Sequence, residues 1–191
     1  MARIHFITHP EVVIDPSVPI GQWGLSPRGL ARGRAMLAHP WVAGVASVFS
    51  SAERKALDLA ALLAGHRGLA VAEHPALGEN DRSATGYLPK TEFEATADAF
   101  FARPTDSVRG WERAVDAQAR IVAALRAVEA AAPPGEVAVV AHGGVGALLL
   151  CHLKAVPISR AEDQPGEGGG NRFVFTRGQW RLLEGWQPIE S

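Results

Sequence analysis

The chain has few of the features that mark disulfide-rich, zinc-binding, membrane or secreted proteins. Cys151 is the only cysteine, so it cannot form an internal disulfide and no Cys/His zinc spacing is present. The most apolar window, Val137 to Leu153, is interrupted by His142, Gly143 and Gly144 and is too short to span a bilayer. No apolar run follows basic residues at the start, so we expect no signal peptide and a cytoplasmic protein without membrane contact.

The charge balance favours neither sign. The 191 residues include 19 lysines and arginines against 20 aspartates and glutamates, which gives a formal net charge of −1. No overall electrostatic field therefore draws the protein to nucleic acid, but the net charge does not exclude a local basic pocket. Hydrophobic residues make up 47% of the chain, a globular composition. We expect one domain over residues 1–191.

Short β-rich runs alternate with longer helical patterns, which predicts an α/β domain. Strands are predicted at Arg3–Thr8, Val45–Phe49, Leu69–Glu73, Glu136–Ala141, Arg172–Thr176 and Trp180–Trp186. Helices are predicted at Pro27–Ala38, Ala52–Ala64, Gly110–Ala132 and Gly143–Leu153. The segment Asp81–Arg103 is expected to form a small lid or cap, and the glycine-rich Gln164–Gly170 a mobile surface loop.

Three polar side chains follow the ends of three predicted strands. They are His9, Arg54 and His142. If these strands are parallel, all three side chains lie at one edge of the sheet, where open α/β folds bind ligands. Gly143 and Gly144 would add backbone N–H groups at a helix N-terminus, which favour an anion. This combination of residues indicates phosphate.

A neutral imidazole can attack phosphorus and form a phosphohistidine, while cations hold the other oxygens of the phosphoryl group. The leaving alcohol then needs a proton. Glu79, in the loop after the third predicted strand, is the best placed acid, and Asp81 or Glu11 could share this role. None of these steps requires a metal ion or another cofactor.

The order of the short motifs resembles the histidine phosphatase superfamily, which includes the cofactor-dependent phosphoglycerate mutases. Thr8-His9-Pro10-Glu11 is similar to its Arg-His-Gly-Glu signature. The other resembling segments are Trp23–Gly29 (opening of the first helix), Ser50–Ala56 (Ser-Ser-…-Arg-Ala), Leu77–Glu79 (Leu-x-Glu) and Val139–Gly144 (Val-x-His-Gly). The resemblance covers about Arg3 to Asn171, nearly the whole chain.

The resemblance implies a three-layer α/β/α sandwich with a mainly parallel sheet, as in phosphoglycerate mutase-like proteins. It implies that His9 is the nucleophile and Glu79 the proton donor. His142 and Arg54 would bind phosphate, and Gly143 would offer a backbone amide. We also include Thr8, Glu11 and Arg82 among the candidate phosphate- or substrate-binding residues.

Three positions depart from the family pattern. Thr8 stands where the family has its first arginine, Pro10 replaces a glycine, and Asp15 falls where the family has asparagine, which would add negative charge near the phosphate. One lost charged hydrogen bond is worth about 1.5–3 kcal/mol, so these changes bear on activity more than on fold. Arg82 or Arg172 could compensate for the missing arginine.

These observations predict a metal-independent phosphomonoesterase that acts on a small phosphorylated metabolite through a phosphohistidine. The alternative is a catalytically impaired relative that binds a phosphorylated ligand or protein partner without turnover, which Thr8, Pro10 and Asp15 favour. A phosphoglycerate mutase-type transfer is a lesser option, because the segment between Glu79 and Gly110 is short for an insertion that encloses the substrate. Turnover that depends on His9 separates the enzyme from the binding protein.

Overall fold

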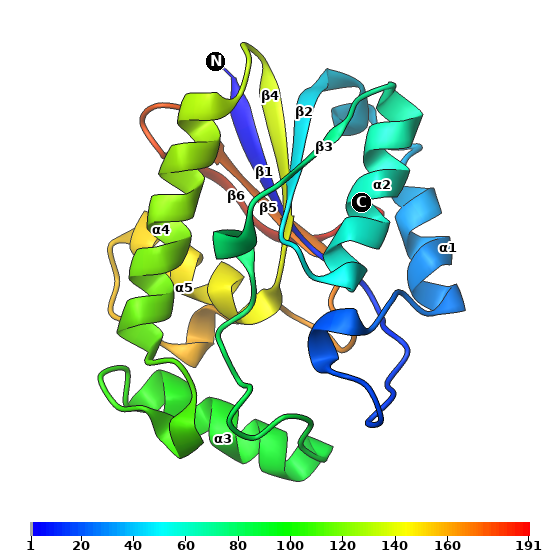
Figure 1. Ribbon diagram of the computed structural model, residues 1–191. Helices are drawn as coiled ribbons and strands as arrows, with labels where there is room; N and C mark the ends of the chain where they lie inside the picture. The colour runs from blue at the N-terminus through cyan, green and yellow to red at the C-terminus, as the bar shows by residue number, and fades with distance from the viewer. Residues whose placement is uncertain (1) are drawn as a thin grey trace.

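A six-stranded sheet in the order β3-β2-β4-β1-β5-β6 forms the centre of the molecule (Figure 1). The computed structural model describes residues 2–191. The strands are β1 (Arg3–Thr8), β2 (Val45–Ser50), β3 (Val71–Glu73), β4 (Glu136–Ala141), β5 (Asn171–Thr176) and β6 (Leu182–Pro188). The first four strands run parallel to one another, and β5 and β6 pair antiparallel at one edge. The expected mainly parallel sheet is confirmed.

Helices connect the strands. They are α1 (Pro27–Met36), α2 (Arg54–Arg67), α3 (Lys90–Ala102), α4 (Ala114–Ala131) and α5 (Gly143–Lys154). Short 3₁₀ turns lie at Ile20–Gln22, Pro40–Gly44, Pro75–Leu77, Val108–Gly110 and Arg160–Glu162. Local sequence sets the ends of several helices. The Ser26 hydroxyl accepts a hydrogen bond from the Gly29 amide at the start of α1, and Gly68 ends α2 in the left-handed conformation.

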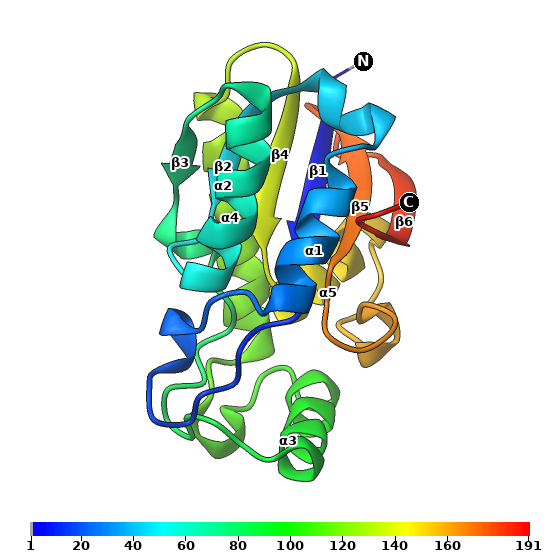
Figure 2. The ribbon, with the colours of Figure 1, turned by 90° about the vertical axis from the view of Figure 1, so that its right-hand side faces the viewer.

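Helices cover both faces of the sheet. Side chains of a strand point to alternate faces, and in β4 the side chains on both faces are apolar and buried. In β4, Val137 and Val139 pack with residues of α4 and α5, whereas Ala138 and Val140 pack with residues of α1 and α2. Figures 1 and 2 show the two helix pairs on opposite sides of the sheet. This arrangement confirms the three-layer α/β/α sandwich.

The third helix lies apart from both layers, beyond the carboxyl ends of the parallel strands (Figure 2). Phe100 and Phe101 of α3 form a separate apolar cluster with Trp111 and with Leu148 of α5. The segment expected to form a lid thus contains a helix that packs at the end of the sheet where His9 and His142 lie. Among residues 2–191, no helix combines the length and apolar character needed to cross a membrane.

Two segments differ from the sequence predictions in ways that matter for the site. The second helix begins at Arg54 rather than at Ala52. The glycine-rich loop 164–170 lies at the surface as predicted, with residues 165–168 exposed, but its last residue, Gly170, is buried against the residues that follow β1. The Gly170 amide donates a hydrogen bond to the His9 carbonyl oxygen at 3.0 Å.

Candidate active site

His9 follows β1 directly, and its ring has a defined orientation. Nδ1 lies 2.9 Å from the Pro10 carbonyl oxygen, and because a carbonyl can only accept, Nδ1 carries the hydrogen. The other ring nitrogen, Nε2, is then the one with a free electron pair. Burial lowers the pKa of His9, and the neighbouring His142 ring lowers it further, to about 3. The imidazole is therefore neutral at physiological pH, with Nε2 available as a nucleophile.

His142 follows β4, and its ring lies edge-on to the His9 ring, with the two ring centroids 5.2 Å apart. The side chain is fully buried. Its Nε2 lies 2.7 Å from the Ser51 hydroxyl oxygen and 3.3 Å from Oε1 of Glu53. Burial lowers the pKa of His142 in spite of the nearby carboxylates. The sheet thus brings His9 and His142 together, as expected for two residues that follow the ends of parallel strands.

Arg54 does not join this pair. Its side chain is 66% exposed and forms an ion pair with Asp58, one helical turn further along α2, at 2.7 Å. The next residue, Lys55, is only 4% exposed. The ammonium of Lys55 lies 2.7 Å from Oε2 of Glu53 and donates to the Ile20 carbonyl at 2.8 Å. The buried cation of this segment is therefore Lys55 and not Arg54, a correction to the sequence prediction.

Glu53 lies between the buried lysine and the buried histidine. Burial by itself would raise the pKa of Glu53, but His142 and Lys55 together hold it at about 2. One carboxylate oxygen also accepts a hydrogen bond from the Glu79 amide at 3.0 Å. Glu53 therefore remains ionised, and it neutralises the charge of Lys55 at the edge of the site.

Glu79 is buried against the first turn of α5. Its carboxylate accepts hydrogen bonds from the amides of Gly144 and Val145, both at 3.0 Å. Burial would raise the pKa of Glu79, but Arg82, His142 and the Gly144 amide together lower it. The N-terminus of α5, which the sequence suggested as a phosphate site, thus holds a carboxylate in this structure.

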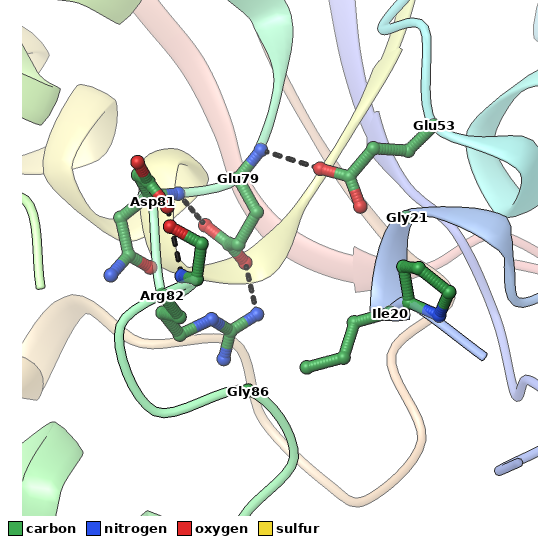
Figure 3. Close-up of a pocket in the computed structure, with 10 residues that line it drawn as sticks. Ile20, Gly21, Glu53, Glu79, Asp81, Arg82 and Gly86 are labelled. Atoms are coloured by element: carbon green, nitrogen blue, oxygen red, sulfur yellow. Dashed lines mark hydrogen bonds and ion pairs between the residues drawn. The ribbon is translucent and has the colours of Figure 1, made fainter. Parts of the chain in front are cut away.

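Arg82 lies beside Glu79, with Nη2 3.9 Å from Oε2 (Figure 3). Its guanidinium also lies over the rings of Phe93 and Trp111, at 5.2 and 5.5 Å from the ring centroids. Arg172, the other candidate to replace the missing arginine, forms an ion pair with Glu184 instead. Of the two candidates, Arg82 is the one that lines the cavity described below.

The hydroxyl of Thr8 is fully engaged. It accepts a hydrogen bond from the Asn171 amide at 2.9 Å and donates to Oε1 of Gln164 at 2.7 Å. Gln164 in turn faces the start of α5, since a Cβ on Gly143 would lie 2.2 Å from its Nε2. Thr8 therefore anchors the glycine-rich loop next to Gly143 and has no free donor for a phosphate.

Glu11 also serves the loop rather than the pair of histidines. Its carboxylate contacts Arg28 and Arg32, each at 3.1 Å. Arg32 further donates to the carbonyl oxygens of Gly169 and Gly170, both at 2.9 Å. This network fixes the loop against α1.

The remaining departures from the family pattern have small structural effects. Pro10 lacks an amide hydrogen, but its carbonyl provides the acceptor that orients His9. Asp15 is exposed, and its carboxylate accepts hydrogen bonds from Ser17. It does not line the cavity, contrary to the expectation that it would add negative charge near the phosphate. Hydrogen bonds from Ser17 lower the pKa of Asp15.

A cavity of about 820 Å³ opens between His9, the start of α5, α3 and the glycine-rich loop. Its polar lining includes His9, Glu79, Arg82 and the Gly143–Gly144 turn. A second cavity of about 550 Å³ adjoins it and is lined by Glu53, Glu79 and Arg82, which Figure 3 shows turned toward one another. Five of the residues discussed line neither cavity: Arg54, Thr8, Glu11, Lys55 and His142. Lys55 and His142 both contact Glu53, which lines the second cavity. Within residues 2–191, no group of three or more His, Cys, Asp or Glu side chains is arranged to hold a metal ion.

Sequence reasoning missed Lys55, Glu53 and Gln164. A signal for Lys55 was present, because the family's Ser-Ser-…-Arg-Ala segment places the cation directly before alanine, and Lys55 directly precedes Ala56. Glu53 gave no comparable signal. Gln164 could not be found from the sequence, since its partner Thr8 lies 156 positions away.

Comparisons with known proteins agree with the fold. A family model described as histidine phosphatase superfamily (branch 1) matches residues 21–186. No curated protein sequence matches the chain significantly. Among solved structures, mycobacterial glucosyl-3-phosphoglycerate phosphatase with inorganic phosphate has a TM-score of 0.81 at 22% identity, with 100% of both chains covered.

Two further structures show the same fold at lower identity. Bacillus stearothermophilus YhfR has a TM-score of 0.79 at 18% identity, covering 96% of this chain and 95% of its own. A mutant phosphoserine phosphatase from Entamoeba histolytica, in complex with phosphoserine, has a TM-score of 0.74 at 14% identity, covering 100% and 98%. The family model spans most of the sequence and the fold agrees over its full length, so the chain belongs to the histidine phosphatase superfamily, branch 1.

Proposed function

We propose that the protein is a metal-independent phosphomonoesterase that hydrolyses a small phosphorylated metabolite through a phosphohistidine at His9. The observation that carries the proposal is the state of the His9 ring. Nδ1 donates to the Pro10 carbonyl and the pKa of the ring is about 3, so Nε2 has a free electron pair without a separate base, on a residue that lines the cavity. Membership of the superfamily and similarity to solved phosphatases support it.

In the proposed reaction, Nε2 of His9 attacks phosphorus and the bond from phosphorus to the alcohol oxygen breaks. The departing oxygen takes a proton, for which Glu79 is the proposed donor. A water molecule then attacks the phosphohistidine, the nitrogen–phosphorus bond breaks, and inorganic phosphate leaves. General acid catalysis of the first step is worth about 10²–10⁴-fold in rate.

Glu79 must gain a proton to act as this acid, although the pKa of its carboxyl is lowered in the free protein. The phosphate of a bound substrate carries negative charge, and like charges close together favour the protonated form of a carboxylate. The phosphate would also compete with Glu79 for the Gly144 amide. Substrate binding would therefore release Glu79 from α5 and raise its pKa.

Lys55, Arg82, His142 and the Gly143 amide are the proposed partners of the phosphoryl oxygens. Lys55 replaces Arg54 in this role, because only Lys55 is buried beside Glu53 and His142. Arg82 lines the cavity next to Glu79 and supplies a second cation, in place of the arginine that the family has at the position of Thr8. We also propose that residues 1–191 act as one domain in which residues 81–103 form the cap over the site.

The first test is hydrolysis of 4-nitrophenyl phosphate by the wild-type protein and by His9→Ala. His66→Ala serves as a control, because His66 is an exposed residue near the end of α2. We expect turnover in the wild type and in His66→Ala, and a loss of at least about 10³-fold in His9→Ala. Turnover that persists in His9→Ala would exclude the phosphohistidine route.

The second candidate function is binding of a phosphorylated ligand without turnover. The favouring observation is that the charged groups around the histidines are already paired: Lys55 with Glu53, and Glu79 with α5 and Arg82. For this candidate, inorganic phosphate should bind to the wild type, as measured by calorimetry, while no phosphomonoester is hydrolysed at pH 5–8.

A further inference from the structure

The cavity that contains His9 has largely aromatic walls on the side away from the sheet. Trp23 and Tyr87 form a tilted pair with their ring centroids 5.8 Å apart, and Phe93 and Trp111 form a second tilted pair at 6.0 Å. All four residues line the cavity, although they come from three separate segments of the chain. Trp23 and Trp111 are largely buried, so Tyr87 and Phe93 offer more of the accessible aromatic surface. The part of a ligand that extends from His9 therefore meets aromatic rings.

Some of this apolar surface is uncovered. Tyr87 is 41% exposed and Ile14 is 59% exposed, and both line the same cavity. Large apolar side chains of a soluble protein are usually covered, and clusters of exposed ones mark binding sites. An apolar ligand group would remove this surface from water.

The cations along the cavity are each paired with a carboxylate. Lys90 contacts Glu167, Arg82 lies beside Glu79, and Arg160 contacts Glu94, Asp98 and Asp163. The lining contains three cations (Arg82, Lys90 and Arg160) against four carboxylates (Glu79, Glu94, Asp163 and Glu167). Once Arg82 binds the phosphate, a second anionic group on the ligand would face carboxylates and find no unpaired cation among these residues.

We propose that the substrate carries a single phosphate and that its alcohol part is an uncharged aromatic or bulky apolar group. This inference rests on the proposed function and names its substrate class. The phosphate binds at His9, and the apolar group packs against Phe93, Trp111 and Tyr87 under α3. Phosphate esters with an additional carboxylate or phosphate are poor substrates, because the carboxylates of the cavity lining outnumber its cations and repel a second negative charge.

The test compares alkyl phosphates with similar leaving groups, so that chemistry does not mask binding. The probes are 2-phenylethyl phosphate, ethyl phosphate and 2-carboxyethyl phosphate. We expect kcat/KM to be at least about tenfold higher for the phenylethyl ester than for the ethyl ester, and lowest for the carboxyethyl ester. Equal or higher kcat/KM for the carboxyethyl ester would overturn the proposal.

Two variants assign the preference to the aromatic walls. Phe93→Ala removes a half-buried ring of α3, and Tyr87→Ala removes a ring that is 41% exposed. Each should bring the kcat/KM ratio of the phenylethyl to the ethyl ester closer to one. Leu183→Ala, an exposed apolar residue of β6 that does not line the cavity, should leave the ratio unchanged. An unchanged ratio in both aromatic variants would overturn the assignment.

Binding of phosphonates separates a failure of this inference from a failure of the proposed function. These compounds cannot be hydrolysed, and binding is measured by calorimetry. If no ester is turned over but 3-phenylpropylphosphonate binds at least about tenfold more tightly than propylphosphonate, the proposed function fails and the ligand class stands. If the two phosphonates bind equally, or neither binds, the ligand class is overturned whatever the turnover.

Discussion

At the scale of single residues, the site is built from charges that stabilise one another. Lys55 and Glu53 form a buried ion pair, and Glu53 also contacts His142. Breaking a buried pair by removing one partner leaves an uncompensated charge, which costs about 3–5 kcal/mol. Variants at this pair must therefore be designed so that stability and ligand binding can be told apart.

The role of Lys55 can be tested in a charge-balanced background. In the double variant Glu53→Gln/Lys55→Met the pair is removed together. We expect kcat/KM for 4-nitrophenyl phosphate to fall about 10–100-fold relative to the wild type, because one charged hydrogen bond to phosphate is lost. Arg54→Ala should stay within about twofold of the wild type, because the Arg54 side chain lies in solvent. A larger loss in Arg54→Ala than in the double variant would restore the original assignment.

Glu79 has a distinct signature as a proton donor. Glu79→Gln keeps an acceptor for the α5 amides but cannot donate a proton as an acid does. We expect a loss of about 10²–10⁴-fold in kcat for ethyl phosphate and a much smaller loss for 4-nitrophenyl phosphate, whose leaving group needs no proton. Equal losses on both esters would show that Glu79 only supports the structure of α5.

At the scale of elements, the glycine-rich loop sets the position of His9. Gly169 has a φ of +70°, and a Cβ there would lie 2.3 Å from the His9 carbonyl oxygen. Gly166 has a similar φ of +77°, but a Cβ there would meet nothing within 4 Å. These two glycines separate the cost of a left-handed backbone from the cost of a collision with the residue proposed to attack phosphorus.

Alanine variants at the two positions should behave differently. Gly166→Ala should lower the unfolding free energy by about 1–2 kcal/mol, because it only forces alanine into the left-handed conformation. Gly169→Ala has the same backbone cost, and its Cβ also collides with the His9 carbonyl oxygen. We therefore expect a further loss of stability and a fall in kcat of about 10²-fold. Urea unfolding and 4-nitrophenyl phosphate kinetics measure the two effects. Identical behaviour of the two variants would mean that the loop does not position His9.

How well the sequence predicted each element depended on how local its determinants are. The bounds of β1 and β4 match the predicted Arg3–Thr8 and Glu136–Ala141, because both strands are compact, mostly apolar runs that are almost entirely buried. The start of α2 was set two residues early. Arg54 was chosen because it is the arginine of the Ser50–Ala56 segment, whereas the buried cation is Lys55, which directly precedes Ala56.

At the scale of the whole molecule, neutral buried histidines link stability to pH. Burial lowers the pKa values of His5, His9 and His142, that of His9 to about 3 from an ordinary value of 6.5. Between these two values the unfolded chain binds more protons than the folded one. The unfolding free energy therefore decreases as the pH falls below 6.5.

The expected pH dependence is specific enough to test. Between pH 6.5 and 4.5, His9 alone should lower the unfolding free energy by up to about 3 kcal/mol, at about 1.4 kcal/mol per pH unit. Glu53 and Glu79 add a loss mainly below about pH 4.5, the ordinary pKa at which these carboxyls take up protons in the unfolded chain while the folded protein still keeps them ionised. In His9→Asn the unfolding free energy, measured in urea at several pH values, should depend less steeply on pH. An unchanged slope would mean that His9 is not held neutral by burial.

The central claim is that His9 Nε2 accepts the phosphoryl group, and the most direct measurement is the covalent state of the protein during turnover. The wild type and His9→Asn are mixed with 4-nitrophenyl phosphate, quenched in alkali, where phosphohistidine survives, and measured by intact-mass spectrometry with peptide mapping. We predict one phosphoryl group per chain, located on His9 and absent from His9→Asn. Steady hydrolysis with no phosphoryl group on His9, at an equal rate in both proteins, would contradict the account.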